Sequence, residues 1–471
     1  MSALNKNTGL YTDHYEITMA QGYYLSGRQN YLAGFDYFFR NNPFEGGYTL
    51  FAGLETLLET LKNYRFDDED CRYLKSIGFD KKFIEYLRGF EFRGDIYSVK
   101  EGEVAFPNEP VVRVEGNIVE TQLIETLLLN ILNFQSLIAT KATRMRWIAG
   151  NRLLLDFGLR RAQGLGAIHA SRAAIIGGFD MTSNLYSAYY FGLTSSGTMA
   201  HSWIQTFDSE IAAFREFIKF YPNTAILLVD TYDTLNSGVP NAITVAKELE
   251  EKGGKLTGIR LDSGDLAYLS KLARKLLDEV QLEYVKIVAS NQLDEYLIRS
   301  LIEQKAPIDA FGVGTALVTG KDEAALDGVY KLNHIEGDPK MKLSDNLSKM
   351  TLPADKKIFR FFNRQEATFE IDGIEIIGSD VPDVLYHPQQ PEKYTSVKDL
   401  KYEEILDKVM EKGKPLFEKT TINSIAEYAK RRLEQIPDGT RRFENPHTYR
   451  VGIGSKLMRL RDRLKDSLWK H

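Results

Sequence analysis

The sequence predicts an α/β fold built around a parallel β-sheet, and three observations lead to this prediction. From about residue 225, short apolar segments that end in polar residues alternate with amphipathic helical segments. The apolar segments are continuous, which is typical of strands buried on both faces of a parallel sheet. The regions on either side alternate between apolar and polar residues, as antiparallel strands do. Repeated βα units form either a barrel or a doubly wound sheet.

Length and composition limit the class of protein. A chain of 471 residues exceeds the roughly 250–300 residues that one hydrophobic core supports, so we expect two or three domains. The formal net charge of -5 disfavours non-specific binding to nucleic acid or to anionic membranes. Cys71 is the single cysteine, which fits a reducing compartment. Without a signal-peptide pattern or an apolar run of about 20 residues, we expect a cytoplasmic protein.

Four apolar segments follow one another in the central region, and a fifth precedes them. The four read AILLVDTYD, KLTGIRLDSGD, VKIVASNQLD and DAFGVGT, and the earlier one reads RLLLDFGLRRAQG. In both candidate architectures, ligands bind at the carboxyl ends of the strands. The residues expected there are Asp230, Asp233, Arg260, Asp262, Ser263, Ser290, Asn291 and Thr315. Helix capping would explain Asn291 and Asp233. It does not explain the arginines at two strand ends, which are Arg260 and the pair in DFGLRRAQG.

The helix expected between the second and third of these segments has an apolar stripe. The stripe comprises Leu266, Leu269, Leu272, Leu276 and Val280, and we expect it to pack on the sheet. Asn291 is the expected N-cap of the next helix, whose buried residues would be Leu297, Leu301 and Ile302. The sequence thus predicts a helix–strand–helix succession in this region.

The patterns divide the chain into four parts. We expect an N-terminal α+β domain at 1–136, the βα region with the active site at 137–340, a β-rich segment at 341–420 that returns to the N-terminal domain, and a C-terminal helical segment at 421–471. The charged end of that last segment is more typical of a solvated helix face than of a nucleic-acid-binding patch.

An ordered set of strings gives the chain a family resemblance. They are TDHYEITMA, FFRNNPF, DFGLRRAQG, GGFDMTSN, GTMAHSW, LLVDTYDT, GIRLDSGD, GVGT and MKLS. Together they resemble nicotinate phosphoribosyltransferase, a type II phosphoribosyltransferase. The resemblance implies an irregular TIM-like α/β barrel, a β-rich N-terminal domain and a homodimer with a shared active site. It also implies synthesis of nicotinate mononucleotide from nicotinate and phosphoribosyl pyrophosphate, with Mg²⁺ and with ATP as co-substrate.

The resemblance implies a role for each matching residue. His201 would become a phosphohistidine, since a neutral imidazole is nucleophilic near pH 7, and Asp262 would share the catalytic role. The expected nicotinate-binding residues are Tyr15 from the second subunit, Phe157, Arg160, Thr198 and Arg260. The expected phosphate-binding residues are Arg40, Asp262, Ser263, Gly314 and Thr315. No metal ligand is assigned.

Other interpretations stay open for several of these residues. His201 could be a structural histidine, Arg260 and Asp262 could form a surface ion pair, Phe157 could be core packing, and Gly314 could belong to a plain turn. For the whole chain, the alternatives are a nicotinamide or quinolinate phosphoribosyltransferase, or an inactive barrel that acts as a binding protein.

Overall fold

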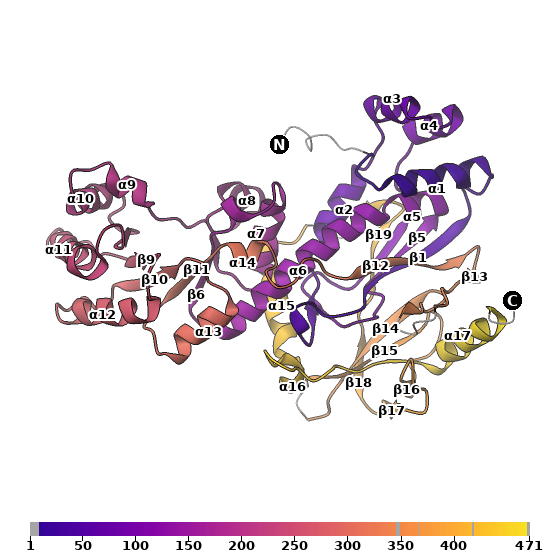
Figure 1. Ribbon diagram of the computed structural model, residues 1–471. Coiled ribbons are helices and arrows are strands. Elements are labelled where there is room, and N and C mark those ends of the chain that lie inside the picture. The colour runs from indigo at the N-terminus through magenta and orange to yellow at the C-terminus, as the bar shows by residue number, and fades with distance from the viewer. Residues whose placement is uncertain (1–8, 345–348, 366, 417–418, 469–471) are drawn as a thin grey trace. The chain divides into compact units, whose positions relative to one another are not determined.

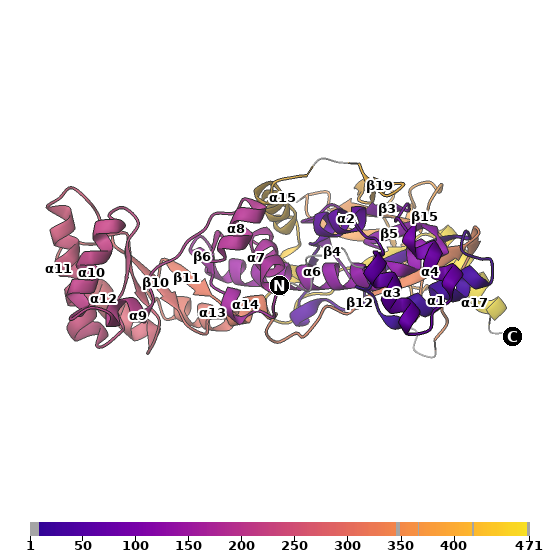
Figure 2. The same ribbon diagram turned by 90° about the horizontal axis from the view of Figure 1, so that it is seen from above.

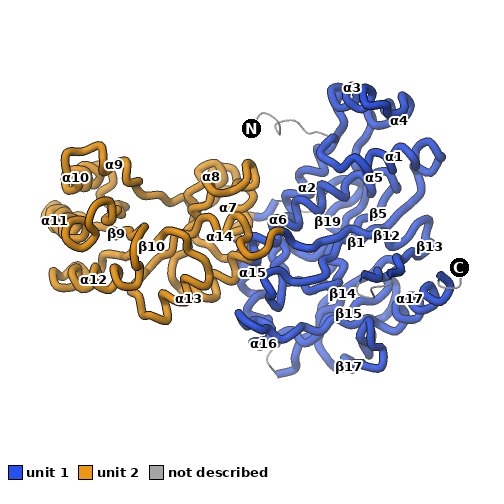
Figure 3. Tube along the Cα trace, in the orientation of Figure 1, with its two compact units in different colours: residues 1–140, 325–420, 424–471 blue, residues 141–324, 421–423 orange. Residues whose placement is uncertain are grey.

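The computed structural model describes residues 9–344, 349–365, 367–416 and 419–468. The chain forms two compact units (Figure 3). Unit 1 combines residues 1–140, 325–420 and 424–471, whereas unit 2 comprises residues 141–324 with a short addition at 421–423. The division between the two units falls within the long helix α6 (Glu125–Ala149). The chain therefore enters unit 2 along a helix and later returns to unit 1.

Unit 2 contains a six-stranded sheet in which every pairing is parallel (Figure 1). Its strands are β6 (Leu153–Asp156), β7 (Met181–Thr182), β8 (Ile226–Leu228), β9 (Gly258–Leu261), β10 (Lys286–Ser290) and β11 (Ala310–Val313). They are arranged in the order β7-β6-β11-β10-β9-β8. The parallel sheet predicted from the apolar segments is confirmed, and all five of those segments contribute a strand.

Helices follow the strands of unit 2 in the expected alternation. They are α7 (Gly166–Ile176), α8 (Leu185–Phe191), α9 (His201–Gln205), α10 (Glu210–Phe220), α11 (Val239–Glu250), α12 (Leu266–Asp278), α13 (Glu295–Glu303) and α14 (Thr315–Val318), with shorter turns η3 (Leu159–Arg161) and η4 (Thr234–Gly238). Among the described residues, no helix is both long and apolar enough to span a bilayer.

The face that α12 buries differs from the prediction. Its fully buried residues include Ala267, Ser270 and Ala273, whereas Leu269 and Leu272 of the predicted stripe are only partly buried. Leu266 of the stripe is buried as predicted, and Leu277, outside the stripe, is buried as well. The pattern of leucines thus predicted the helix correctly, but its buried face is rotated from the predicted stripe towards the small residues.

The N-terminus of α13 also differs from the prediction. The N-cap is Asp294, whose carboxylate accepts a hydrogen bond from the backbone N–H of Leu297 at 2.9 Å. Asn291 instead has a φ of 88°, a left-handed conformation that asparagine tolerates better than most residues. Of the predicted buried residues, Leu301 is buried, while Leu297 is 37% exposed. The helix therefore starts later than expected and turns a different face inward.

The ends of unit 2 are joined by a buried lysine. Lys141, at the start of the unit, is fully buried, and its ammonium group is 2.9 Å from Glu295 Oε1. The same ammonium donates to the carbonyl oxygen of Lys321 at 2.6 Å and lies 3.3 Å from Asp322. The place where the chain enters unit 2 is thus tied to the place where it leaves.

Unit 1 contains two larger sheets and a small one. The seven-stranded sheet has the order β13-β12-β1-β5-β3-β19-β20, the six-stranded sheet has the order β17-β16-β21-β15-β14-β18, and β2 pairs with β4. The strands are β1 (Leu32–Phe39), β2 (Thr49–Leu50), β3 (Asp95–Ser98), β4 (Val104–Ala105), β5 (Val112–Asn117), β12 (Gly328–Ile335), β13 (Asp338–Pro339), β14 (Lys356–Phe362), β15 (Phe369–Ile376), β16 (Val384–Tyr386), β17 (Tyr394–Ser396), β18 (Lys401–Glu404), β19 (Asp407–Glu411), β20 (Lys414–Pro415) and β21 (Val451–Ile453).

Segments far apart in the sequence pair within these sheets. β3 pairs with β19 (Figure 2), where Ile96 lies opposite Met410, and β1 pairs with β12 (Figure 1). The helices of unit 1 include α1 (His14–Leu25), α2 (Leu54–Lys62), α3 (Asp68–Ser76), α4 (Lys81–Arg88), α5 (Ile118–Leu123), α15 (Ile422–Glu434), α16 (Asp438–Arg441) and α17 (Ser455–Leu468). The C-terminal region thus supplies a strand, β21, as well as helices.

A fully buried arginine lies at the centre of a hydrogen-bond network that joins five segments. Arg360 on β14 donates from Nε and Nη2 to Asp372 on β15, at 3.0 and 2.6 Å, and from Nη1 to Glu103 at 2.6 Å. Glu103 also accepts from Arg432 on α15 at 2.8 Å, and Tyr449 donates to Asp372 at 2.9 Å. Charged hydrogen bonds therefore link the segment of Glu103, the strands β14 and β15, the helix α15 and the C-terminal segment of Tyr449.

Replacing Arg360 should destabilise unit 1 strongly. Arg360→Met leaves Asp372 and Glu103 buried without this partner, and breaking a buried pair costs about 3–5 kcal/mol. Arg364→Met is the matched control, because Arg364 pairs with Asp399 on the surface and such pairs contribute about 0–1 kcal/mol. Urea unfolding of the two variants measures the difference. Equal losses of stability would contradict the role given to Arg360.

Candidate active site

Three polar side chains meet at the carboxyl ends of β9 and β10. Arg260 Nε donates to Ser290 Oγ at 3.1 Å, and the Ser290 hydroxyl donates to the carboxylate of Asp262. Arg260 Nη2 lies 3.3 Å from Asp262 Oδ2. The ion pair considered from the sequence is therefore present, but Arg260 is only 11% exposed and Asp262 26% exposed. It belongs to a recessed cluster in which Ser290 bridges the two charges.

His201 lies beside this cluster. It is the first residue of α9, its Nδ1 lies 3.0 Å from Thr231 Oγ1, and its Nε2 lies 3.8 Å from Asp262 Oδ2. The contact with Thr231 fixes the imidazole on its Nδ1 side. The side chain is 40% exposed, so the ring is also accessible to solvent. Thr231 follows β8 in the sequence, and its contact with His201 could not be inferred from the spacing of the two residues.

The segment before α9 contacts Arg260 directly. Arg260 Nη1 donates to Thr198 Oγ1 at 2.5 Å and to the carbonyl oxygen of Met199 at 3.2 Å. The string that contains His201 is therefore attached to the string that contains Arg260 and Asp262. Because these bonds join a loop to a strand end, they also fix where α9 begins.

Asp230 supports the turn after β9. Its Oδ2 accepts from the backbone N–H of Asp262 at 2.8 Å and from the Ser263 hydroxyl at 2.6 Å. The sequence placed Asp230 at a strand end without giving it a role, and its structural partners reveal that it orients two of the expected site residues. Asp233 instead caps η4, accepting from the N–H groups of Leu235 and Asn236, as the capping interpretation predicted.

The loop after β6 packs against the end of β11. The backbone N–H of Phe157 donates to the carbonyl oxygen of Val313 at 2.8 Å. The Phe157 ring lies against Gly312, where an added Cβ would be 2.4 Å from the ring, and the Arg260 guanidinium is 5.9 Å from the ring centroid. Phe157 is thus a packing residue that also borders the cluster. Arg160, on η3, is exposed.

The end of β11 brings two further expected residues to the same edge of the sheet. Gly314 precedes the four-residue helix α14, and Thr315 is the first, exposed residue of that helix. A Cβ at Gly314 would lie 3.2 Å from the carbonyl oxygen of Phe157, so the two loops are close. Gly314 is the N-cap of α14, and it adjoins the loop of Phe157.

Tyr15 and Arg40 belong to unit 1. Tyr15 lies on α1 and is 49% exposed, and burial of its neighbourhood raises the pKa of its hydroxyl. The next residue, Glu16, is fully buried, and desolvation raises the pKa of Glu16 to about 7. Arg40 follows β1 and lies over the ring of Phe38 at 6.0 Å. The other expected site residues all belong to unit 2.

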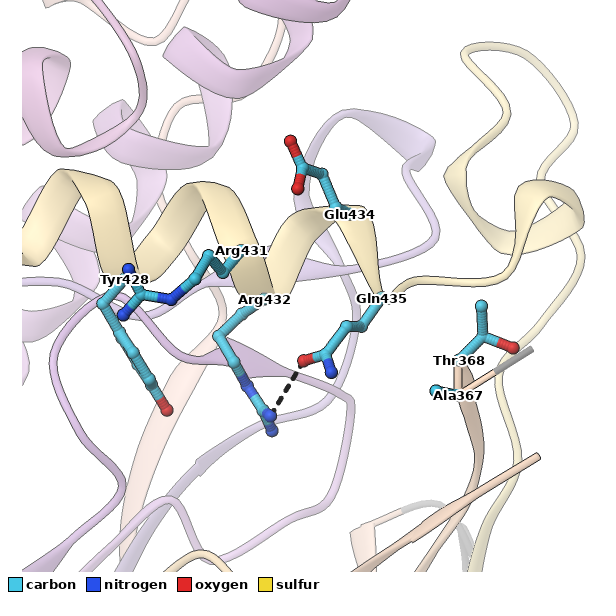
Figure 4. Close-up of a pocket in the computed structure, with 7 residues that line it drawn as sticks. All are labelled: Ala367, Thr368, Tyr428, Arg431, Arg432, Glu434 and Gln435. Carbon is cyan, nitrogen blue, oxygen red and sulfur yellow. Dashed lines mark hydrogen bonds between the residues drawn. The ribbon is translucent and has the colours of Figure 1, made fainter. Parts of the chain in front are cut away.

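A hollow of about 420 Å³ lies in unit 1 and contains none of the expected site residues (Figure 4). It is lined by Ala367, Thr368, Tyr428, Arg431, Arg432, Glu434 and Gln435. The guanidinium of Arg432 already donates to Glu103 at 2.8 Å, to Gln435 at 3.0 Å, and to Glu403. Its charge is therefore matched within the protein. We place the candidate active site at the strand ends of unit 2.

The described residues include no group of three or more His, Cys, Asp or Glu side chains arranged to hold a metal ion. A metal at the strand ends would therefore depend on few protein ligands. This suits Mg²⁺, which commonly uses one or two carboxylates together with substrate phosphates and water. Asp262 and Asp230 supply carboxylates of that kind at the edge of the sheet.

Comparison with known proteins extends along nearly the whole chain. Residues 10–133, 153–372 and 355–461 match, in turn, the N-terminal domain, the family region and the C-terminal domain of nicotinate phosphoribosyltransferase. The chain is 43% identical over 454 residues to the nicotinate phosphoribosyltransferase of Bacillus subtilis (strain 168), covering 94% of this chain and 92% of that protein.

Solved structures give the same result. The crystal structure of human nicotinic acid phosphoribosyltransferase superposes with a TM-score of 0.87 at 30% identity, over 96% of this chain and 99% of that one. A nicotinate-nucleotide pyrophosphorylase from Pyrococcus furiosus shares the fold, with a TM-score of 0.71 at 23% identity over 91% of this chain and 95% of that chain. From these matches and the ordered strings, the chain belongs to the nicotinate phosphoribosyltransferase family.

Proposed function

We propose that this protein joins nicotinate to phosphoribosyl pyrophosphate, forming nicotinate mononucleotide and pyrophosphate in NAD biosynthesis in the cytoplasm. ATP hydrolysis is coupled to the synthesis through phosphorylation of His201. The observation that carries the proposal is the position of His201, which is held by Thr231 and faces Asp262 beside the Arg260–Ser290 pair. The names of the relatives support the substrates.

The sheet of unit 2 is proposed to form the strand wall of an irregular barrel. The order β7-β6-β11-β10-β9-β8 is the chain order of six strands around a ring, with a seam between β7 and β8. In a ring, the first and last strands become neighbours, and here β6 pairs with β11 in parallel. A doubly wound sheet instead has a switch point from which the strand order runs outwards in both directions. The strand order thus supports the barrel.

His201 has the environment that a phosphoryl acceptor requires. With the ring proton on Nδ1 and directed at Thr231, Nε2 of the partly exposed imidazole is free to attack the γ-phosphorus of ATP. The Nε2–P bond forms as the bond from the γ-phosphorus to the bridging oxygen breaks, and ADP leaves. The Asp262 carboxylate, 3.8 Å from Nε2, is close enough to stabilise positive charge that develops on the imidazole. Phosphorylation then adds negative charge beside Arg260, which couples the state of His201 to the residues that hold the substrates.

Arg260 and Arg160 are proposed to have different roles. Arg260 is fully engaged with Ser290, Thr198 and Asp262, so it organises the site and borders the phosphates. The exposed guanidinium of Arg160 has no hydrogen-bond or ion-pair partner within the described part of the chain. A planar fork of donors matches a carboxylate, the group that distinguishes nicotinate from nicotinamide. Arg160 therefore recognises that carboxylate.

The remaining residues hold the ring and the phosphoribosyl group. Phe157, with Tyr15 of a second subunit, stacks on the pyridine ring, and Thr198 contacts nicotinate next to Arg260. The phosphoribosyl pyrophosphate is bound by Asp262 and Ser263 at the ribose, by Gly314 and Thr315 at the 5′-phosphate, and by Arg40 at the pyrophosphate. Mg²⁺, when bound, would neutralise charge on the leaving pyrophosphate. Placement of these groups is the main source of catalysis.

A homodimer with shared active sites accounts for the division of the site residues. Tyr15 and Arg40 come from unit 1, whereas the cluster around His201 comes from unit 2. Tyr15 is half exposed, so its aromatic ring is accessible to the pyridine bound in a second subunit. We therefore assign Tyr15 and Arg40 to the site of the second subunit.

Loss of His201 should uncouple ATP hydrolysis from synthesis. His201→Ala should abolish ATP-dependent stimulation and leave a slow transfer that does not require ATP, because the ring that accepts the phosphoryl group is gone. Mass spectrometry after treatment with ATP should place the phosphate on His201 of the unmodified protein. His447→Ala, at an exposed position in unit 1, is the control. Phosphate on another residue, together with full stimulation of His201→Ala, would refute the assignment.

The two arginines should differ in their effect on substrate choice. Arg160→Gln should lower kcat/KM for nicotinate roughly ten- to a hundredfold, since a charged hydrogen bond contributes about 1.5–3 kcal/mol, and should change residual nicotinamide use little. Arg260→Gln should lower both activities alike. Arg161→Gln, also on η3 and exposed, is the matched control. An unchanged ratio of nicotinate to nicotinamide use in Arg160→Gln would exclude it as the carboxylate site.

Sharing of the active site can be tested by complementation. Tyr15→Ala and Asp262→Ala should each be nearly inactive alone, but a mixed dimer contains one site that carries neither change. Co-expression of the two variants with different affinity tags, followed by tandem purification, should therefore yield protein with partial activity. A fully active monomer in analytical ultracentrifugation would overturn the shared site.

A further inference from the structure

A buried polar network lies beneath the loop that carries Phe157 and Arg160. Its centre is Asp156, the last residue of β6, which is fully buried. Asp156 Oδ2 accepts from the hydroxyl of Ser171 on α7 and from that of Thr182 on β7, both at 2.7 Å. Asp156 Oδ1 accepts from the backbone N–H of Gly158 at 2.8 Å. One carboxylate thus connects a helix, a neighbouring strand and the loop.

The partners of Asp156 are all neutral. Desolvation raises the pKa of Asp156, and the hydrogen bonds from Ser171, Thr182 and Gly158 act in the opposite direction. Burial of a carboxylate is costly unless its oxygens receive hydrogen bonds, so the group is stable here only while its three donors stay in place. The geometry of the network is therefore tightly constrained, and the constraint extends to the Gly158 amide.

The bond to Gly158 fixes the direction in which the chain leaves β6. The N–H of Phe157 is bonded to Val313 on β11, and the next N–H, that of Gly158, is bonded back to Asp156. A Cβ at Gly158 would lie 2.0 Å from Val318 Cγ1, so the loop also lies tightly against α14. Together these contacts hold the Phe157 ring against Gly312 and start the turn η3, on which Arg160 is exposed.

We propose that Asp156 is a positioning residue for pyridine binding, which acts by holding the Gly158 amide and thereby the loop of Phe157 and Arg160. The inference rests on the proposed function, in which Phe157 and Arg160 bind nicotinate. Asp156 contacts no substrate itself. The network predicts a larger effect on the nicotinate side of the site than on the phosphoribosyl side. Of the residues proposed to hold the phosphoribosyl group, Gly314 adjoins the loop of Phe157, whereas Asp262 and Ser263 follow β9.

Three variants separate positioning from stability. Asp156→Ala removes the acceptor of the Gly158 N–H. It should raise KM for nicotinate roughly ten- to a hundredfold, because a small displacement of binding groups has an effect of this size. KM for phosphoribosyl pyrophosphate should change less than about threefold. Asp156→Asn keeps an oxygen for Gly158, and the hydroxyls of Ser171 and Thr182 can accept from its amide, so KM should return to near the unmodified value. Thr182→Val is the control: it removes one bond of the same carboxylate, together with the acceptor of the Asn184 N–H, but spares Gly158.

Proteolysis gives a second readout that does not depend on activity. Arg160 and Arg161 are exposed trypsin sites on η3. Brief trypsin treatment should cleave after these residues several times faster in Asp156→Ala than in Asp156→Asn or Thr182→Val, with the site identified by mass spectrometry. Should Asp156→Ala fail to fold, Asp156→Val replaces it, because its apolar side chain fills more of the vacated space and offers no acceptor to the Gly158 amide.

The outcomes are distinguishable. Absence of nicotinate mononucleotide from the unmodified protein would overturn the proposed function. Product from the unmodified protein, with an unchanged KM for nicotinate and unchanged cleavage in Asp156→Ala, would overturn the role of Asp156 alone. A rise in KM for nicotinate that is equal in Asp156→Asn and Asp156→Ala, or equal in Thr182→Val, would show that the network acts through stability and would also overturn it.

Discussion

Parallel pairing of β6 with β11 is the contact on which the candidate active site depends. These are the first and last strands of unit 2 in the sequence, and their register places Asp156 opposite Val313. Because both strands run in the same direction, the loops that follow them start at the same edge of the sheet. The Phe157 ring can then rest on Gly312, and Gly314 can approach the Phe157 carbonyl. The same geometry brings Arg260 on β9 beside Ser290 on β10.

The sequence was sufficient for the features that follow from burial along a strand. Continuous apolar segments predicted the parallel strands, and a parallel strand ends where its polar residues begin, so Arg260, Asp262 and Ser290 could be placed at one edge. Partners across loops were not predictable, since the bonds of Arg260 to Thr198 and of His201 to Thr231 depend on loop conformation. The buried face of α12 was placed only in part, because the spacing of leucines does not show where small residues such as Ala267, Ser270 and Ala273 are buried instead.

The protein stabilises buried charge in two different ways. In unit 1, the Arg360 guanidinium is surrounded by carboxylates, so opposite charges offset the cost of desolvation. In unit 2, Asp156 has neutral donors alone among its hydrogen-bond partners, and its stability depends on the exact positions of dipoles. The first arrangement fastens distant segments together. The second makes a strand end rigid where a loop must hold a substrate.

The discontinuity of unit 1 has a consequence for synthesis on the ribosome. Unit 2 is nearly continuous in the sequence, and Lys141 ties its beginning to its end, so it can fold as soon as its last strand emerges. In unit 1, β1, β5 and β3 are made early, but their neighbours β12 and β19 are translated much later. Until then the nascent sheet has two open edges, which are sites of mispairing between chains. The N-terminal strands of unit 1, rather than the strands of unit 2, are therefore the part of the nascent chain most exposed to mispairing.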